Sequence, residues 1–167
     1  MPGDILIVDD DFFSAEFMRQ SLAQLRSPVL VAPTARAAHD VLVRRPIDLV
    51  LLDATLPDAS GFEVCHWLRQ HSTDIAIMFV TGRADVEDRR RAFALGADDF
   101  LSKPFPLAEL MTRVRATLRQ RNEHLPHASI ATLDLTRKML TLPDKRAISL
   151  TPPIIDDCHE NLLMESK

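Results

Sequence analysis

The sequence contains no tyrosine, so no site can use a phenol, and its two cysteines, Cys65 and Cys158, lie far apart. Without metal-ligand spacing or a disulfide pattern, they favour free thiols in a reducing compartment. No apolar run approaches the roughly 20 residues of a membrane span, and no basic stretch precedes the first one. An excess of positive charge is also missing, because the net charge is −4. This balance argues against a protein that coats nucleic acid or a membrane surface, and we expect a cytoplasmic protein.

Short apolar runs alternate with segments of helical periodicity through about residue 121. The 167 residues, of which 46% are hydrophobic, suffice for one sizeable domain and a small appendage. Five runs are too short for helices and lack polar alternation, which is typical of strands covered on both faces. They are Ile5–Val8, Val29–Ala32, Leu49–Leu52, Ile75–Val80 and the weaker Phe100–Leu101. The pattern predicts an α/β fold with a parallel sheet between two layers of helices.

Polar side chains stand at the ends of four of these runs. They are Asp9–Asp11, Asp53, Thr81 and Lys103. Because ligands bind outside the carboxyl ends of parallel strands, we expect these groups to meet at one edge of the sheet. Adjacent carboxylates repel one another, and Mg²⁺, which takes oxygen ligands and keeps several waters, would relieve this repulsion. One carboxylate could then act as a nucleophile, while the hydroxyl and the ammonium bind phosphoryl oxygens.

Each of these residues also has a simpler interpretation when it is taken alone. Asp11 fits a helix N-cap or a solvated turn, and Asp53 fits a turn residue. Thr81 and Gly82 are a common turn opening, and Lys103 could lead into a helix. The joint arrangement, with each residue at a strand end, is what favours a site.

Four segments carry a resemblance to a known family: ILIVDDD, DLVLLDATLPDASGFEV, VTGRAD and GADDFLSKPF. They resemble the receiver domain of bacterial two-component response regulators over residues 1–121. The resemblance implies a doubly wound, CheY-like and flavodoxin-like sheet of five parallel strands in the order 2-1-3-4-5. It also implies phosphoryl transfer from a sensor histidine kinase and slow hydrolysis, which is the chemistry of a signalling protein rather than of an enzyme.

The resemblance assigns a role to each polar residue of the predicted edge. It implies that Asp53 is the phosphoacceptor, and that Thr81 and Lys103 contact the phosphoryl group. The residues implied to hold Mg²⁺ are Asp9, Asp10, Asp53 and, through its backbone carbonyl, Thr55. The Lys103–Pro104 peptide is expected to be cis.

The resemblance also implies a conformational switch, in which Thr81 moves toward the phosphoryl group and an aromatic residue fills the vacated space. The matching residue is Phe100, which can fill the space but cannot donate a hydrogen bond as the commoner tyrosine does. Arg83, two residues after Thr81, borders the pocket that would hold the phosphoryl group. It either shields that group from water or is a solvated loop residue.

The stretches EDRRRAFALGADDF and LAELMTRVRATLRQR resemble the OmpR/PhoB subclass. This resemblance implies a homodimer, formed on phosphorylation, through the fourth helix, the fifth strand and the fifth helix. Opposite charges on these elements would specify the dimer. The candidates are Arg89, Arg90, Asp98, Asp99, Glu109, Arg113 and Arg115. A solvated charged face is the alternative interpretation of Arg89–Arg91.

The C-terminal part divides into an expected linker, residues 122–129, and residues 130–167. The latter contain three strand-like runs with a turn at Pro143–Arg146 and resemble the sheet that opens a winged-helix DNA-binding domain. The recognition helix and the wing are missing, and residues 122–167 carry five Lys/Arg against seven Asp/Glu. We therefore expect a truncated winged-helix domain, with protein contacts rather than DNA binding as the output.

Two other functions are compatible with part of the sequence. A transcriptional regulator that retains DNA binding would need the missing recognition elements. A haloacid-dehalogenase-type phosphohydrolase also uses strand-end aspartates, but it needs Thr or Val two residues after an Asp-x-Asp pair. Here Asp9 and Asp11 are followed by Phe12 and Phe13, so the match fails.

Overall fold

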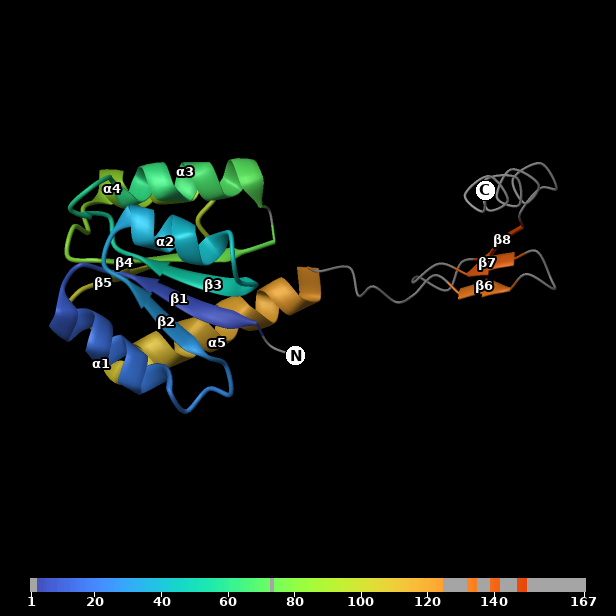
Figure 1. The fold of residues 1–167 in the computed structure, drawn as a ribbon, viewed down its shortest axis with the longest axis horizontal. Helices are drawn as coiled ribbons and strands as arrows, with labels where there is room; N and C mark the ends of the chain where they lie inside the picture. Colours follow the sequence, from blue (N-terminus) through green and yellow to red (C-terminus); the bar gives the residue numbers. More distant parts are fainter. Residues whose placement is uncertain (1–2, 73, 125–131, 135–138, 142–146, 150–167) are drawn as a thin grey trace, which may run out of the picture. The chain divides into compact units, whose positions relative to one another are not determined.

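The computed structural model describes residues 3–72, 74–124, 132–134, 139–141 and 147–149. The chain divides into two compact units, residues 1–122 and 123–167, and each is described by itself. In the first unit strands and helices alternate along the chain (Figure 1). Their bounds are β1 Asp4–Val8, α1 Phe12–Leu22, β2 Val29–Ala32, α2 Ala35–Leu42, β3 Ile47–Leu52, α3 Gly61–His71, β4 Ala76–Thr81, α4 Val86–Ala94, β5 Asp99–Ser102 and α5 Leu107–His124.

The five strands form one parallel sheet in the order β2-β1-β3-β4-β5, which confirms the predicted order. In this register Ile7 pairs with Val31 on one side and with Leu51 on the other. Three strands begin earlier than the apolar runs indicated, because Asp4 and Ile47 pair at the end of the β1–β3 ladder and Asp99 pairs with Met78. The strand order leaves the carboxyl ends of β1, β3, β4 and β5 side by side, which positions the residues that follow them.

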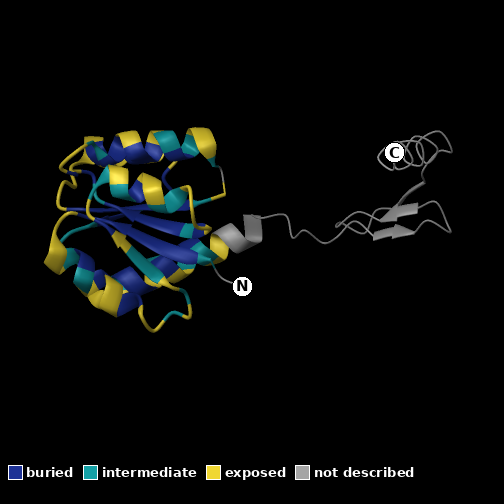
Figure 2. Ribbon diagram, in the orientation of Figure 1, coloured by how far each residue is buried: buried dark blue, intermediate teal, exposed yellow. Residues whose placement is uncertain are grey.

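The sheet is covered on both faces, as its continuous apolar runs require. Successive side chains of a strand point to opposite faces, so Ile5 and Ile7 contribute to one core and Leu6 and Val8 to the other. Helices α1 and α5 cover the first face, and α2, α3 and α4 cover the second (Figure 1). The strands β1, β3 and β4 are buried, the edge strand β2 is partly exposed, and most other exposed residues lie on the outer faces of the helices and in the loops (Figure 2).

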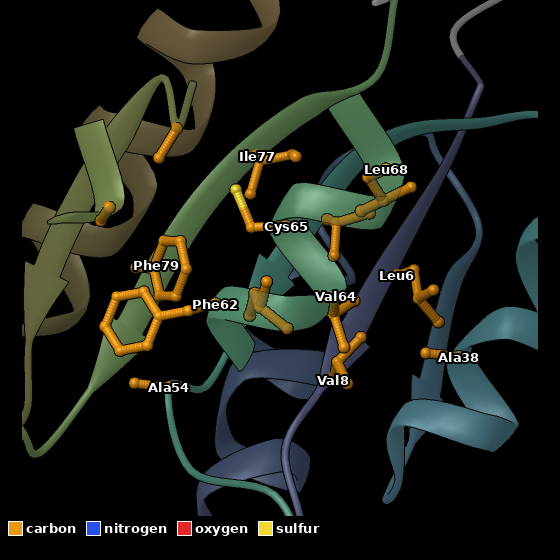
Figure 3. Packing of buried hydrophobic residues seen from close by; sticks show 14 of the residues in the cluster. Leu6, Val8, Ala38, Ala54, Phe62, Val64, Cys65, Leu68, Ile77 and Phe79 are labelled. Carbon is orange, nitrogen blue, oxygen red and sulfur yellow. The ribbon is translucent and has the colours of Figure 1, made fainter. Parts of the chain in front are cut away.

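The core on the second face is built around aromatic rings (Figure 3). Phe79 of β4 stacks on Phe62 of α3 at 5.1 Å between centroids and on Phe100 of β5 at 6.2 Å. Cys65 lies in the same core and is fully buried. Burial raises the pKa of the Cys65 thiol to about 11. The thiol is therefore protonated and inert near neutral pH.

Helix starts follow the capping residues of the sequence. Asp11 caps α1, so the N-cap interpretation of this residue is confirmed, and Thr34 and Asp85 cap α2 and α4. Ser60 and Glu63 form a capping box at the start of α3. After α4, Gly96 adopts a φ of 95°, a conformation that favours glycine.

The second unit contains three short strands, β6 Thr132–Asp134, β7 Met139–Thr141 and β8 Ala147–Ser149. They pair antiparallel in the order β6-β7-β8 and coincide with the three strand-like runs. Helix α5 continues through His124, so the expected linker begins within a helix. The turn at 143–146, the residues after 149 and Cys158 lie outside the described residues. In the described part of the chain, no helix has both the length and the hydropathy to cross a membrane.

Candidate functional site

The carboxyl edge of the sheet brings together Asp9, Asp53, Thr81 and Lys103. The Nζ of Lys103 lies 2.6 Å from Oδ2 of Asp9 and 2.8 Å from Oδ2 of Asp53. The hydroxyl of Thr81 donates to the other carboxylate oxygen of Asp53, Oδ1, at 3.0 Å. Four residues from four strand ends thus form one hydrogen-bonded cluster, as the position of each after an apolar run predicts.

Backbone hydrogen bonds that continue the sheet hold these residues in place. The Asp9 amide donates to Ala32 at 3.1 Å, and the Asp53 amide donates to Val8 at 2.9 Å. The Lys103 amide likewise donates to the carbonyl of Thr81 at 2.9 Å. The positions of the functional side chains therefore follow from the parallel ladder.

Local hydrogen bonds orient the two carboxylates further. Asp9 accepts from the Ser14 hydroxyl at 2.7 Å and from the Asp11 amide at 3.0 Å. Asp53 accepts from the Thr55 amide at 2.9 Å. The Lys103–Pro104 peptide is cis, as expected.

The cluster combines two poorly solvated carboxylates with one ammonium. The side chain of Asp9 is 1% exposed, that of Asp53 is 12% exposed and that of Lys103 is 20% exposed. Burial, the largest single effect, lowers the pKa of Lys103, but the hydrogen bonds that it donates to Asp53 and Asp9 and their negative charges together raise it by more, so the net pKa lies above its usual value. Lys103 is therefore charged near neutral pH, and one negative charge of the pair remains without a counter-charge.

This excess of negative charge fits a small divalent cation. The Oδ2 atoms of Asp9 and Asp53 both lie within hydrogen-bonding reach of one nitrogen, so a single ion at the edge could contact both. Asp10, in contrast, is exposed and makes no hydrogen bond or ion pair within the described residues. In that part of the chain no three acidic, histidine or cysteine side chains converge as a metal centre. The arrangement suits an ion that keeps several waters, as Mg²⁺ does.

Thr81 and Phe100 are packed inward beside this cluster. Thr81 is 1% exposed and Phe100 is 2% exposed. The ring of Phe100 forms one end of the stack with Phe79 and Phe62, and the guanidinium of Arg89 lies 5.2 Å from its centroid. At the other end, Arg91 lies 4.4 Å from the Phe62 centroid. Helix α4 is thus fixed to both ends of the stack by cation–π contacts.

The sequence matches the family model of the response regulator receiver domain over residues 5–115. The chain belongs to the response regulator receiver family. A curated relative, the response regulator MprA of Mycobacterium sp. (strain KMS), is 38% identical over 156 residues, which are 90% of this chain and 68% of the relative.

Two further relatives show how far the similarity extends. The probable transcriptional regulatory protein SilR of Salmonella typhimurium is 32% identical over 86% of this chain and 63% of its own length. Among solved structures, the response regulator DrrB, an OmpR/PhoB homologue of Thermotoga maritima, superposes with a TM-score of 0.67. It is 30% identical over 72% of this chain and 54% of its own. The receiver domain is thus shared with regulators of OmpR type.

The receiver domain contains three contacts around the candidate site and its loops that sequence patterns did not reveal. The Ser14 hydroxyl orients Asp9, and its place three residues after the Asp11 cap is the signal that could have identified it. The carboxylate of Asp58, which follows the Asp53 loop, accepts from the Ala35 amide at 2.8 Å and so holds the start of α2. Asp88, in the first turn of α4, is buried beside Arg83.

The receiver domain uses several of the predicted dimer charges within the chain. Arg113 pairs with Asp99 and with Glu109, each at 3.0 Å. Asp98 pairs with Arg69 of α3 at 2.8 Å and accepts from the Ile77 amide at 2.7 Å. Arg90 pairs with Glu87 at 2.8 Å, while Arg89 contacts the Phe100 ring and Arg115 is exposed. Asp98 therefore already has an internal role that joins α3 to β4.

Proposed function

We propose that this receiver domain accepts a phosphoryl group on Asp53 from the phosphohistidine of a sensor histidine kinase. The observation that carries the proposal is the shared position of Lys103 between Asp53 and Asp9. It places a positive charge beside an aspartate that is partly open to solvent, with a hydroxyl on the aspartate's other oxygen. A carboxylate that only capped a turn would not need this combination.

The reaction is a phosphoryl transfer in which the protein supplies position and charge. An oxygen of Asp53 forms a bond to phosphorus, and the bond from phosphorus to the donor imidazole nitrogen breaks. The electron pair stays on that nitrogen, which water protonates. Lys103 and the Thr81 hydroxyl contact the phosphoryl oxygens. Hydrolysis later returns Asp53 to its free form, so the domain is a signalling protein that catalyses its own modification.

Mg²⁺ is the cofactor that we propose for this transfer. Asp9 and Asp53 would hold it, together with the Thr55 carbonyl and with Asp10 after its exposed side chain turns inward. When bound, the ion supplies positive charge for the phosphoryl oxygens. Lys103, released from part of its contact with Asp9, would then serve the phosphoryl group.

The switch consists of Thr81 and Phe100. Both are already inward before phosphorylation, so we propose that the phosphoryl group stabilises this arrangement rather than creating it. The α4–β5–α5 surface, with Arg89, Arg90, Asp99 and neighbouring charges, would then form the homodimer. Individually such exposed pairs add little stability, and they specify the partner.

The output is proposed to be a protein contact of a cytoplasmic regulator whose domains are a receiver at residues 1–121, a linker at 122–129 and a partial winged-helix domain at 130–167. One observation favours a second function, transcriptional regulation, because the relative SilR is described as a probable transcriptional regulatory protein. A gel shift with the phosphorylated protein on its own upstream DNA tests this alternative. The acidic balance of residues 122–167 leads us to expect no shift.

Intact-mass measurement after incubation with acetyl phosphate and magnesium chloride tests the phosphoacceptor. We expect the mass of one added phosphoryl group in the wild type, and none with Asp53→Asn or with a chelator. Asp40→Asn, an exposed substitution on α2, serves as the matched control and should accept the group. Modification that persists in Asp53→Asn would assign the phosphoryl group to another residue and refute the proposal.

A further inference from the structure

The loop between β4 and α4 connects the phosphoacceptor cluster to a buried charge in helix α4. The Arg83 amide donates to the Thr81 hydroxyl oxygen at 3.1 Å, and Thr81 in turn donates to Asp53. The Arg83 side chain leads away from this point, and its Nε lies 3.5 Å from Oδ2 of Asp88. The backbone of Arg83 thus belongs to the site, while its guanidinium is turned toward α4.

Asp88 holds this guanidinium for a physical reason. Its side chain is 12% exposed, and the Oδ2 atom is buried without a hydrogen-bond partner in the described residues. The N-terminal turn of α4 favours a negative charge, and the Asp88 amide donates to the Asp85 cap at 2.6 Å. Arg83 supplies the ion-pair partner of a carboxylate that has little water. A buried carboxylate without a counter-charge is costly, so Asp88 competes strongly for Arg83.

We propose that Asp88 is a positioning residue which sets the lifetime of the phosphoryl group by holding Arg83 away from it. This inference rests on the proposed function, because it concerns the phosphoryl group on Asp53. Phosphorylation adds roughly −1.5 to −2 charge near the start of the Arg83 side chain. The 67% exposed side chain of Arg83 is free to move between the two anions. When it pairs with the phosphoryl oxygens it shields them from water, and when it pairs with Asp88 it leaves them open to hydrolysis.

The half-life of the phosphorylated protein, measured after removal of the phosphodonor, tests this competition. Asp88→Asn removes the competing charge at nearly constant shape and is expected to lengthen the half-life about threefold or more, as expected for the loss of a partly exposed ion pair. Arg83→Ala is expected to shorten it. The double variant should behave as Arg83→Ala, because Asp88 acts only through Arg83. Glu87→Gln, which removes the neighbouring charge that pairs with Arg90, should leave the half-life unchanged.

The side-chain Nε–H resonances of arginine in the wild-type protein give a second readout that does not depend on a rate of dephosphorylation. The Arg83 resonance is assigned by its absence in Arg83→Ala. It should shift when beryllofluoride and magnesium, a stand-in for the phosphoryl group, are added. In Asp88→Asn without beryllofluoride it should already differ from the wild type.

Three results would overturn the inference. The first is an unchanged or shorter half-life of phosphorylated Asp88→Asn. The second is a half-life of the double variant equal to that of Asp88→Asn, and the third is an Arg83 resonance that does not shift when beryllofluoride is added. Each is observed on protein that does accept the phosphoryl group or its stand-in, so the proposed function would survive. A wild type that accepts neither would instead refute the proposed function, and the inference with it.

Discussion

Replacing Lys103 by methionine is expected to destabilise the receiver domain, although the residue lies in the candidate functional site. Within the described residues, Lys103 is the only cation that forms an ion pair with Asp9 or Asp53. Methionine keeps much of the apolar stem and removes the charge. The two carboxylates then face each other at a sheet edge that admits little water, so their repulsion and desolvation oppose folding.

The exposed fractions of the three side chains set the size of this effect. Removing one partner of a fully buried pair costs roughly 3–5 kcal/mol, and an exposed pair contributes about 0–1 kcal/mol. Asp9 is 1% exposed, Asp53 12% and Lys103 20%, which places the pair near the buried limit. We expect a loss of about 2–3 kcal/mol, reduced from the buried limit because water reaches Asp53 and Lys103. With an m-value of about 2 kcal/mol/M, the urea midpoint would fall by about 1–1.5 M.

Urea unfolding followed by the fluorescence of Trp67, the only tryptophan, measures this loss near neutral pH in a chelator. Because the folded-state pKa of Lys103 is raised, its stabilising charge is fully present below the usual lysine pKa and is lost only as pH rises above it. Arg90→Met is the matched control, because the Arg90–Glu87 pair is 76% and 71% exposed and contributes little. Millimolar magnesium should restore more stability to Lys103→Met than to the wild type. Equal midpoints for the two variants would show that the cluster stores no such repulsion.

Three further outcomes are expected from the packing of the domain. Stability should decrease by about 2 kcal/mol between pH 9 and pH 11, because the Cys65 pKa rises from 9.0 to about 11 on folding and the unfolded thiol ionises more fully than the folded one in this range. Cys65→Ala should remove this decrease in stability at high pH. If the variant still lost stability as the wild type does, a group other than Cys65 would be responsible. Phe79→Ala should cost about 3–5 kcal/mol in urea unfolding, whereas Phe13→Ala, whose side chain is 82% exposed, should cost under about 0.5 kcal/mol. Arg69→Ala should lower the free energy of unfolding by about 2–3 kcal/mol, because the guanidinium donates hydrogen bonds to the carbonyls of residues 75 and 96 and to an aspartate. A urea midpoint equal to that of the wild type would contradict this role of Arg69.

The parallel sheet and the site edge could be predicted because strands covered on both faces leave a strong signal, whereas the strand order followed only from the resemblance to the receiver family. Each strand is a continuous apolar run, and the polar residue that follows it marks the edge where ligands bind. Strand starts were harder to predict, since Asp4 extends β1 despite its charge. Its carboxylate lies 2.7 Å from Arg45, a partner 41 positions away that no periodic pattern reveals.

Charged residues were the least predictable part, because sequence patterns show where a charge stands but not which charge it meets. Asp98 fits a surface charge of a dimer interface, yet its carboxylate accepts from Arg69 and from the Ile77 amide and so joins α3 to β4 within one chain. Arg89 and Arg91 fit a solvated face, and both are exposed, but their guanidiniums cover the ends of the aromatic stack. Pairings of this kind depend on the crossing of α4 over the sheet, which only the folded chain specifies.

The charges of the site also explain why metal and phosphoryl group should depend on each other. In the free domain Lys103 offsets one of the two carboxylates of Asp9 and Asp53. The proposed phosphorylation of Asp53 would bring roughly −1.5 to −2 charge to this position, which the one ammonium of Lys103 would offset only in part. A divalent cation at Asp9 then gains attraction from the new charge, and by linkage a bound cation favours the phosphorylated form by the same factor. Lys103 cannot supply this coupling alone, because it is already shared between the two aspartates.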